Sequence, residues 1–418
     1  MAHRSGSRGA AGLFGGAVAA GSVLMAGAVF AGAVTTGVAR RITAPGKGTP
    51  VLTTVLAVDA ARGWIRFDAT DDAALAGRYS FWFDGGRGHA RVGRILERGN
   101  GSVTRELLGV DVGTVEAGQT GRFNGWVYLS PASLDVPYDD VRVQTTLGAV
   151  PAWEVPAEGF DSPRWAVLVH GRATVRQEVL RAVPVFRAAG YSTLLVSYRD
   201  DGEAPPSANP RYGLEDAEWL DVESANLNAL DQGAREIVLM GWSMGGAIVL
   251  QTATRSRLAS VVTGIVLESP VLSWAEALLH QGDALDLPGP VKRGALTLVS
   301  SRWGARLTGH DEPIDVRSLE LVARVEDLAV PVLVLHSEDD GFAPIESSRR
   351  LARERPDLVQ LVPFSIARHT KLWNHDPERW EGAIAAWLRG DEEGLRALGA
   401  TVPAGSDRPQ RRRRFQRA

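Results

Sequence analysis

Between about residue 141 and residue 390, short and continuous apolar runs alternate with longer stretches of helical periodicity. The runs are rich in Val, Leu and Ile and are apolar on both faces, which is typical of buried strands. Such strands between amphipathic helices predict an α/β fold with a mostly parallel, doubly wound sheet. In this kind of sheet, ligands bind at the carboxyl ends of the strands. The expected strands are Trp165 to Val169, Thr193 to Ser197, Glu236 to Met240, Val262 to Leu267, Val332 to Leu335 and Leu358 to Val362, and the expected helices are Arg176 to Ala189, Glu215 to Leu230, Gly245 to Arg255, Ile345 to Arg353 and Glu378 to Leu388.

The interval from Val271 to Asp327 interrupts this alternation with residues of helical pattern. We expect a helical cap that is inserted above the sheet. The cap contains large apolar residues, which form either an acyl-binding pocket or the ordinary packing of the cap. They are Trp274, Leu278, Leu279 and Trp303.

Residues 46 to 140, ahead of the sheet region, predict a small and mainly β domain. Its strand-like runs are rich in aromatic and β-branched residues and are separated by turn signals such as Asp84-Gly85-Gly86. Gly86 and Gly88 are spaced like the start of a dinucleotide-binding loop, but no third glycine follows, so a hairpin turn is the better interpretation. The expected strands are Thr53 to Val58, Trp64 to Phe67, Tyr79 to Phe83, Ala90 to Leu96 and Gly125 to Leu129.

The first 45 residues contain an uncharged segment, Ala10 to Ala39, with arginines on both sides. About 20 helical residues cross the hydrocarbon of a bilayer, so the segment is long enough to span it. Because it consists mostly of Ala and Gly, three interpretations stay open: a membrane anchor, an export signal cleaved near Ala31-Gly32-Ala33, and a buried helix. The leading prediction is a single N-terminal anchor at a membrane. Cleavage would instead make the protein secreted.

The composition excludes several kinds of chemistry. The chain has no Cys, which rules out disulfides, thiolate metal sites and a cysteine nucleophile. Its 46 Lys and Arg against 49 Asp and Glu leave a formal charge of -3, which argues against nucleic acid as a partner. Catalysis would therefore depend on Ser, His or carboxylate side chains or on a bound cofactor. Residues 391 to 418 are polar, contain four consecutive arginines at 411 to 414, and predict a disordered tail.

The motif Gly241-Trp242-Ser243-Met244-Gly245 directly follows an expected strand and opens an expected helix. This context is that of a nucleophile elbow, in which a Ser lies on a tight turn between strand and helix. Glycines two residues to either side are required because larger side chains would collide with the neighbouring strand and helix. The motif also occurs by chance in a Gly-rich chain, and it is the flanking elements that make Ser243 the candidate nucleophile.

A Ser hydroxyl needs a general base to activate it, and the base needs an orienting carboxylate. The chain order typical of this elbow is Ser, acid, His. His369 lies in the loop after the last expected strand, which makes it the candidate base, with His375 as the alternative. The segment His336 to Pro344 also follows a strand and contains adjacent carboxylates. Asp340 and Asp339 are both candidates for the acid.

Acyl transfer also needs an oxyanion hole, which is made of two backbone N–H groups. One donor is expected to be the amide of Met244, directly after the nucleophile. The other is assigned to the amide of Arg172, in the loop after the strand that ends at Val169. Gly171 allows the backbone to approach closely, and His170 is expected to support the loop without transferring protons.

These segments together resemble the α/β-hydrolase superfamily of serine hydrolases, in particular its membrane-associated, Bem46-like members. The similarity rests on Val169-His170-Gly171-Arg172, Gly241 to Gly246, His336 to Pro344 and Ala367-Arg368-His369. The family pattern for the third segment is His-Gly-x-x-Asp-x-x-Val-Pro. Ser337 and Ala343 depart from it, whereas Asp340 and Pro344 keep their places, which favours Asp340 as the acid. The resemblance covers about residues 141 to 390 and not the β domain, and it implies neither a metal nor an organic cofactor.

The resemblance implies a serine hydrolase that cleaves a carboxylic ester of a small-molecule or acyl substrate. Ser243 would attack the acyl carbon, His369 would transfer the proton, and Asp340 would orient His369. Thioesterases, lipases and peptidases use the same triad, so these alternatives stay open. A non-catalytic, membrane-tethered interaction module is another alternative, because a fold alone does not prove activity. Against that alternative, every expected catalytic position carries a competent residue.

Overall fold

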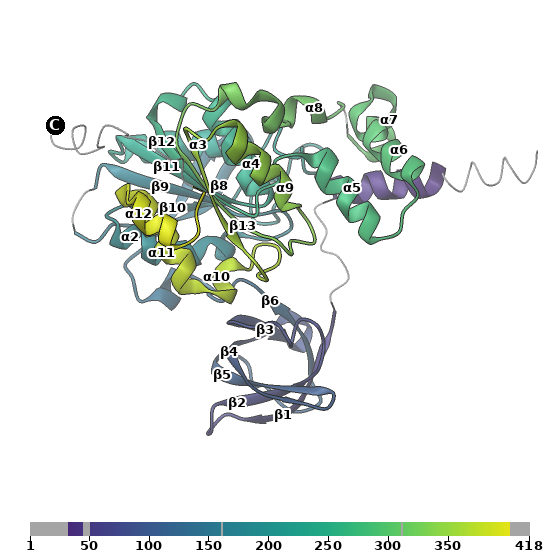
Figure 1. The fold of residues 1–418 in the computed structure, drawn as a ribbon, viewed down its shortest axis with the longest axis vertical. Helices are drawn as coiled ribbons and strands as arrows, with labels where there is room; N and C mark the ends of the chain where they lie inside the picture. The colour runs from purple at the N-terminus through teal and green to yellow at the C-terminus, as the bar shows by residue number, and fades with distance from the viewer. Residues whose placement is uncertain (1–31, 45–50, 160–161, 311, 402–418) are drawn as a thin grey trace, which may run out of the picture.

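The computed structural model describes residues 32–44, 51–159, 162–310 and 312–401. It consists of an α/β domain with helical insertions and a β-barrel that lies against one end of that domain (Figure 1). The predicted α/β-hydrolase type of fold, with a cap and a preceding small β domain, is confirmed.

The α/β domain is built on one eight-stranded sheet in the order β14-β13-β12-β11-β9-β10-β8-β7. The six strands from β14 to β10 are parallel. At the other edge, β8 pairs antiparallel with β10, and β7 pairs antiparallel with β8. Because the carboxyl ends of the parallel strands share one edge, the loops that follow them lie close together. The strands are β7 (Asp139–Thr145), β8 (Gly148–Val155), β9 (Arg164–Val169), β10 (Ser192–Val196), β11 (Glu236–Trp242), β12 (Val262–Glu268), β13 (Val332–Ser337) and β14 (Val359–Phe364).

Helices cover the sheet on both faces. Successive side chains of a strand point to opposite faces, so Val167 and Val169 belong to one apolar cluster and Ala166 and Leu168 to another. The first cluster includes buried residues of α3 (Trp219–Asp231), α4 (Met244–Arg255) and α9 (Ile345–Glu354). The second includes those of α2 (Val183–Ala188), α11 (Pro377–Arg389) and α12 (Glu392–Ala397).

Two expected helices differ from the sequence prediction at their starts. The region from Arg176 begins as a 3₁₀ helix (Arg176–Ala182), and α2 follows with Pro184 in its first turn. Proline has no N–H to continue the hydrogen-bond ladder, so the α-helix starts anew there. Helix α3 begins at Trp219 and not at Glu215, because Leu214 and Glu215 have positive φ angles of 54° and 78° that no α-helix contains.

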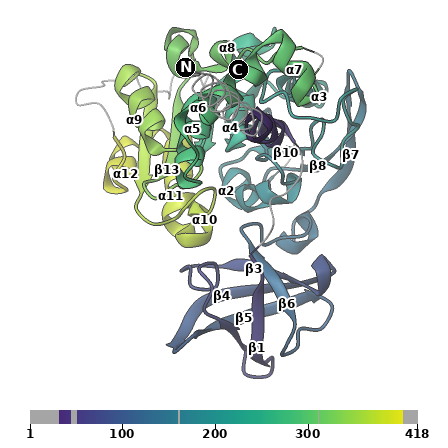
Figure 2. The same ribbon diagram turned by 90° about the vertical axis from the view of Figure 1, so that its right-hand side faces the viewer.

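The interval between β12 and β13 forms the predicted cap. Its helices are α5 (Trp274–Ala284), α6 (Gly289–Ser300), α7 (Arg302–Thr308), α8 (Val316–Leu319) and a 3₁₀ turn (Leu321–Asp327). Figures 1 and 2 show α5, α6 and α7 grouped beside the sheet, together with the purple helix over residues 32–43. We call this last element the N-terminal helix.

The small β domain is a closed six-stranded barrel with the order β1-β2-β5-β4-β3-β6. Its interior is filled by aromatic side chains, and Phe67, Phe81 and Phe123 contact one another. The expected strand Gly125 to Leu129 is wrong: the last barrel strand ends at Asn124, and the following residues form a loop. The sequence prediction also missed β5, because Arg105 and Glu106 break its apolar pattern. The strands are β1 (Thr53–Asp59), β2 (Trp64–Asp68), β3 (Tyr79–Phe83), β4 (Gly88–Gly99), β5 (Ser102–Val112) and β6 (Thr120–Asn124).

The two ends of the chain are described in part. Most of the predicted membrane segment, residues 1–31, lies outside the described residues. Its last part belongs to the N-terminal helix, in which Ala39 and Ile42 are buried against the α/β domain. Among the helices of the described ranges, none combines the length and the apolar character needed to cross a bilayer. At the other end, the prediction of a disordered tail from residue 391 is wrong for residues 391–401, which include α12 and a β-bridge between Thr401 and Leu361. The rest of the predicted tail, residues 402–418, lies outside the described residues.

Candidate active site

Ser243 lies on the turn between β11 and α4, in the strained conformation of an elbow. Its φ and ψ are 51° and -117°, a region that non-glycine residues rarely adopt. The flanking glycines are required by space: a Cβ at Gly241 would lie 2.2 Å from the carbonyl oxygen of Gly245, and one at Gly245 would lie 2.3 Å from that of Val169. The elbow therefore presents the Ser243 hydroxyl at the carboxyl edge of the sheet.

Three loops at this edge bring Ser243, His369 and Asp340 together. The Nε2 atom of His369 lies 2.9 Å from the Ser243 Oγ atom, within hydrogen-bond distance. On the other side of the ring, Nδ1 lies 2.7 Å from Oδ2 of Asp340 and 3.0 Å from Oδ1. With Nδ1 donating its proton to the carboxylate, Nε2 is free to accept the Ser243 proton.

The Asp340 carboxylate is buried and strongly hydrogen-bonded. Its Oδ1 atom accepts the amides of Phe342 and Ala343 at 2.8 and 2.9 Å, and its Oδ2 atom lies 3.2 Å from Nε2 of His336. Burial by itself raises the pKa of Asp340, but the charge of His369 and the hydrogen bonds from both histidines outweigh it. The pKa of Asp340 is therefore held well below its ordinary value, and the side chain faces His369 as a carboxylate.

Asp339 and His375, the alternative acid and base, have other contacts or positions. Asp339 accepts the hydroxyl of Ser337 at 2.6 Å and the amide of Arg368 at 2.8 Å, so it ties the acid loop to the His369 loop. His375 is the last residue of α10 (Leu372–His375). Within the described residues, the fold therefore brings Asp340 and His369 to Ser243, whereas Asp339 contacts Ser337 and Arg368.

The loop after β9 approaches the elbow closely. A Cβ on Gly171 would lie 3.3 Å from the Cβ of Ser243, and the Gly171 amide donates to Glu178 at 2.7 Å. The ring nitrogens of His170 contact Asp201 and the Gly171 carbonyl, at 3.2 and 2.9 Å. These contacts fix the conformation of the loop. His170 therefore contacts the loop that the sequence predicts it to support.

The two amides expected to form the oxyanion hole are those of Arg172 and Met244. Among the described residues, no acceptor takes a hydrogen bond from either amide. Met244 is the first residue of α4, so its N–H belongs to the positive end of the helix dipole. Both amides thus have unused hydrogen-bonding capacity within the described residues: that of Met244 directly follows Ser243, and that of Arg172 follows Gly171, which approaches Ser243.

Glu268, which sequence reasoning did not single out, forms hydrogen bonds to the residues of the elbow. Its backbone carbonyl accepts the amide of Ser243 at 3.0 Å, and its carboxylate accepts the indole N–H groups of Trp242 and Trp380 at 2.7 and 2.8 Å. Burial raises the pKa of Glu268, and the charge of Arg181 partly offsets this. No spacing rule identifies such a residue, because its partners come from three distant segments.

Two of the four apolar cap residues line a cavity next to the site. Trp274 and Leu278 contribute to its wall. Leu279 is not among the lining residues, and Trp303 is 62% exposed on α7. The ring centroid of Phe342, another lining residue, lies 4.7 Å from that of His369, so one wall of the cavity contacts the candidate base.

The barrel contacts the segment that follows His369. Asn374, fully buried in α10, donates through Nδ2 to the carbonyls of Arg78 and Gly125 at 2.8 and 2.6 Å. The Oδ1 atom of Asn374 accepts a hydrogen bond from the Arg181 guanidinium at 3.0 Å. The backbone carbonyl of Asn374 accepts the amide of Arg78 at 2.9 Å. Figures 1 and 2 both show α10 between the sheet and the barrel. The barrel therefore braces the loop that carries His369.

Replacing Asn374 by alanine is expected to lower the free energy of unfolding by about 2 to 4 kcal/mol, because two partly buried carbonyls lose a donor and the buried Arg181 loses one of its acceptors. Urea denaturation of both proteins measures the change. Asn100→Ala, at an exposed turn between β4 and β5, is the matched control and should change stability by less than about 0.5 kcal/mol. Equal stability of the Asn374 variant and the wild type would show that this contact contributes nothing.

Comparison with known proteins finds a family match for the barrel and another for the α/β domain. Residues 54–124 match a domain family of unknown function, and residues 166–386, more than half of the chain, match the alpha/beta hydrolase family. No curated protein matches the chain.

Among solved structures, an esterase from Pyrococcus furiosus is 17% identical, with a TM-score of 0.49, and the match covers 63% of this chain and 94% of that one. Est1E from Butyrivibrio proteoclasticus with ferulic acid bound is 15% identical, with a TM-score of 0.47 and coverages of 60% and 99%. RhEst1, an esterase from Rhodococcus sp. ECU1013, is 19% identical, with a TM-score of 0.42 and coverages of 60% and 98%. The family match over more than half of its length shows that the chain belongs to the alpha/beta hydrolase family.

Proposed function

We propose that this protein is a serine hydrolase that cleaves carboxylic esters through an acyl-enzyme. One observation carries the proposal: the Ser243 hydroxyl, on a strained elbow, lies 2.9 Å from His369, which in turn lies 2.7 Å from the Asp340 carboxylate. Nucleophile, base and orienting acid are thus within hydrogen-bond distance in the order that acyl transfer requires.

In the proposed first half-reaction, Ser243 Oγ forms a bond to the ester carbonyl carbon while its proton passes to Nε2 of His369. The carbonyl electron pair moves to the oxygen, where the amides of Arg172 and Met244 stabilise the negative charge. Each such donor contributes about 3 kcal/mol to transition-state stabilisation. When the carbon–oxygen bond of the leaving group breaks, His369 returns the proton to the departing alcohol.

In the second half-reaction, water replaces the alcohol. It loses a proton to His369, attacks the acyl carbon, and the bond to Ser243 Oγ breaks as the serine regains a proton. Asp340 stays ionised throughout and keeps the His369 proton on Nδ1, so that Nε2 alone exchanges protons with the reactants. The products are a carboxylic acid and an alcohol, and the enzyme is regenerated.

The nucleophile is tested by labelling with a fluorophosphonate, which phosphonylates an activated serine. We expect the wild type to be labelled, Ser243→Ala to be unlabelled, and the exposed-site variant Ser300→Ala to be labelled like the wild type. Turnover of p-nitrophenyl esters, thioesters and anilides by the wild type then distinguishes an esterase from a thioesterase or a peptidase. A folded wild type that is neither labelled nor active would favour the non-catalytic module.

We also propose that the N-terminal segment attaches the protein to a membrane. Residues 10–31, ahead of the N-terminal helix, carry no charge and match the roughly 20 residues that cross a bilayer. Expression of the full chain should place it in the membrane fraction, resistant to alkaline carbonate. Release as a soluble protein that begins near residue 34 would instead identify an export signal.

A further inference from the structure

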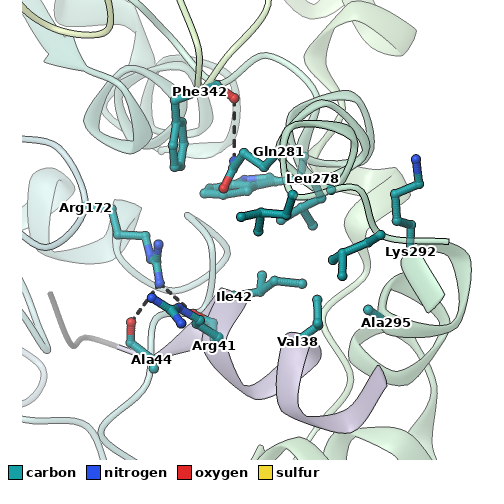
Figure 3. A pocket seen from close by; sticks show the side chains of 14 residues that line it. Val38, Arg41, Ile42, Ala44, Arg172, Leu278, Gln281, Lys292, Ala295 and Phe342 are labelled. Carbon is teal, nitrogen blue, oxygen red and sulfur yellow. Dashed lines mark hydrogen bonds between the residues drawn. The ribbon is translucent and has the colours of Figure 1, made fainter. Parts of the chain in front are cut away.

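A cavity of about 560 Å³ lies between the cap and the N-terminal helix (Figure 3). The cap contributes residues of α5 and α6, and the N-terminal helix contributes Val38, Arg41 and Ile42. Figure 3 shows Val38 and Ile42 on one side of the cavity and Leu278 opposite them. A volume of this size is in the range of pockets for small organic ligands.

The cavity is connected to the site through two residues. Phe342 lines it and also contacts the ring of His369, with 4.7 Å between ring centroids. Arg172, whose amide is an expected oxyanion donor, lines it as well. An acyl chain attached at Ser243 would reach this space past Phe342 and Arg172.

Most of the lining is apolar, and several of its polar groups are already paired. Lys292 forms an ion pair with Asp283, and Gln281 donates to the carbonyl of Phe342. The Arg172 guanidinium donates to the carbonyls of Arg41 and Ala44, both at 2.8 Å. A hydrocarbon chain would fit this lining without stripping any of these groups of its partner. The apolar lining includes Val38, Ile42, Trp274, Leu278, Leu285 and Phe342.

The N-terminal helix is fastened to the α/β domain at its carboxyl end. The last carbonyls of a helix have no partner within the helix, and here other segments supply the donors. Arg211 donates to the carbonyl of Arg40, and the amide of Tyr212 donates to that of Thr43, at 3.2 and 3.0 Å. Together with the bonds from Arg172, these contacts give Val38 and Ile42 a defined position.

We propose that the N-terminal helix is a wall of the acyl-binding site, and that Val38 and Ile42 select esters of aliphatic acyl chains longer than acetyl. This inference rests on the proposed function and adds the substrate class to it. The cap alone would leave the cavity open on the side of residues 38 and 42. The helix closes that side, and its residue Arg41 and the following Ala44 bind the side chain of Arg172, whose amide is an expected oxyanion donor.

The test compares two tryptophan variants of the full chain on the same helix. Val38→Trp places a large ring in the cavity, whereas Gly37→Trp adds one at an exposed position where a Cβ meets nothing within 4 Å. The measurement is kcat/KM for p-nitrophenyl acetate, hexanoate and octanoate. Each buried methylene changes kcat/KM about three- to fourfold, so the loss of two or more makes a change of about tenfold.

We expect the wild type to prefer hexanoate or octanoate to acetate. Val38→Trp should lower the octanoate-to-acetate ratio about tenfold or more, and Gly37→Trp should leave it unchanged. If Val38→Trp does not fold, Val38→Ala decides the question, because removal of two methyl groups should shift the preference to longer chains. An unchanged ratio in the folded Val38 variants overturns the inference.

Fluorophosphonate labelling separates the two possible failures. A wild type that is labelled and hydrolyses esters, together with Val38 variants of unchanged chain-length preference, contradicts only the role of the N-terminal helix. A wild type that is unlabelled and inactive contradicts the proposed function, and this inference is then overturned with it.

Discussion

Replacing His369 by alanine is expected to lower kcat for ester hydrolysis by at least about 10⁴-fold, because His369 is the base that the described part of the chain places within hydrogen-bond distance of Ser243. The Nε2 atom of His369 lies 2.9 Å from Ser243 Oγ, and its Nδ1 atom is held by Asp340. Steady-state kinetics with a p-nitrophenyl ester measure the loss. Fluorophosphonate labelling should fall in parallel, since the same proton transfer activates the serine.

The chain offers a matched control for this prediction. His375, six residues further along, lies in α10 and is the alternative base that the sequence left open. His375→Ala should retain kcat within about tenfold of the wild type. If the His375 variant lost activity and the His369 variant kept it, the assignment of the base would be reversed.

Replacing Asp340 by asparagine should lower kcat by about 10⁴-fold while leaving the loop in place. An asparagine amide directed at Nδ1 would favour the tautomer with its proton on Nε2, which cannot accept the proton of Ser243. Asp339→Asn is the control, because that carboxylate accepts Ser337 and Arg368 and does not contact His369. Equal losses in the two variants would contradict the assignment of Asp340.

The Asp340→Asn variant should also change how the stability of the protein depends on pH. The pKa of Asp340 lies below its ordinary value in the folded protein, so the carboxylate stabilises the fold above the ordinary pKa of about 3.9. This contribution is lost as the pH falls below that value. The difference in unfolding free energy between wild type and Asp340→Asn should therefore shrink between about pH 5 and pH 2. Urea denaturation across this range measures it, and a constant difference would show that the carboxylate is not linked to folding.

The choice between neighbouring carboxylates illustrates a limit of sequence reasoning. Asp339 and Asp340 follow the same strand, and both are plausible from their position. Which one faces His369 depends on the turn of the loop, in which the amides of Phe342 and Ala343 bind Asp340. The family resemblance favoured Asp340, but the contacts of Asp339 with Ser337 and Arg368 come from the folded loops alone.

The barrel strands show a related limit. Strand β5 was missed because Arg105 lies inside the barrel, where its guanidinium donates to the carbonyls of Ala73, Leu75, Gly77 and Gly93. Burial lowers the pKa of Arg105 to about 10. A charged residue at a core position breaks the alternation of apolar and polar residues on which strand prediction depends. Its partners are backbone groups, and no sequence pattern reports them.

The sequence by itself determined the α/β architecture, the elbow at Ser243 and the chain order of serine, acid and histidine. These are local properties: strand and helix periods, and glycines at positions where a side chain would collide. The tertiary structure alone decided that the N-terminal helix lines the cavity and that the barrel braces the loop after His369. Both depend on contacts between segments more than 200 residues apart, such as Arg40 with Leu307 and Asn374 with Arg78. Contacts of that range follow from how the whole chain packs, so no local pattern of residues encodes them.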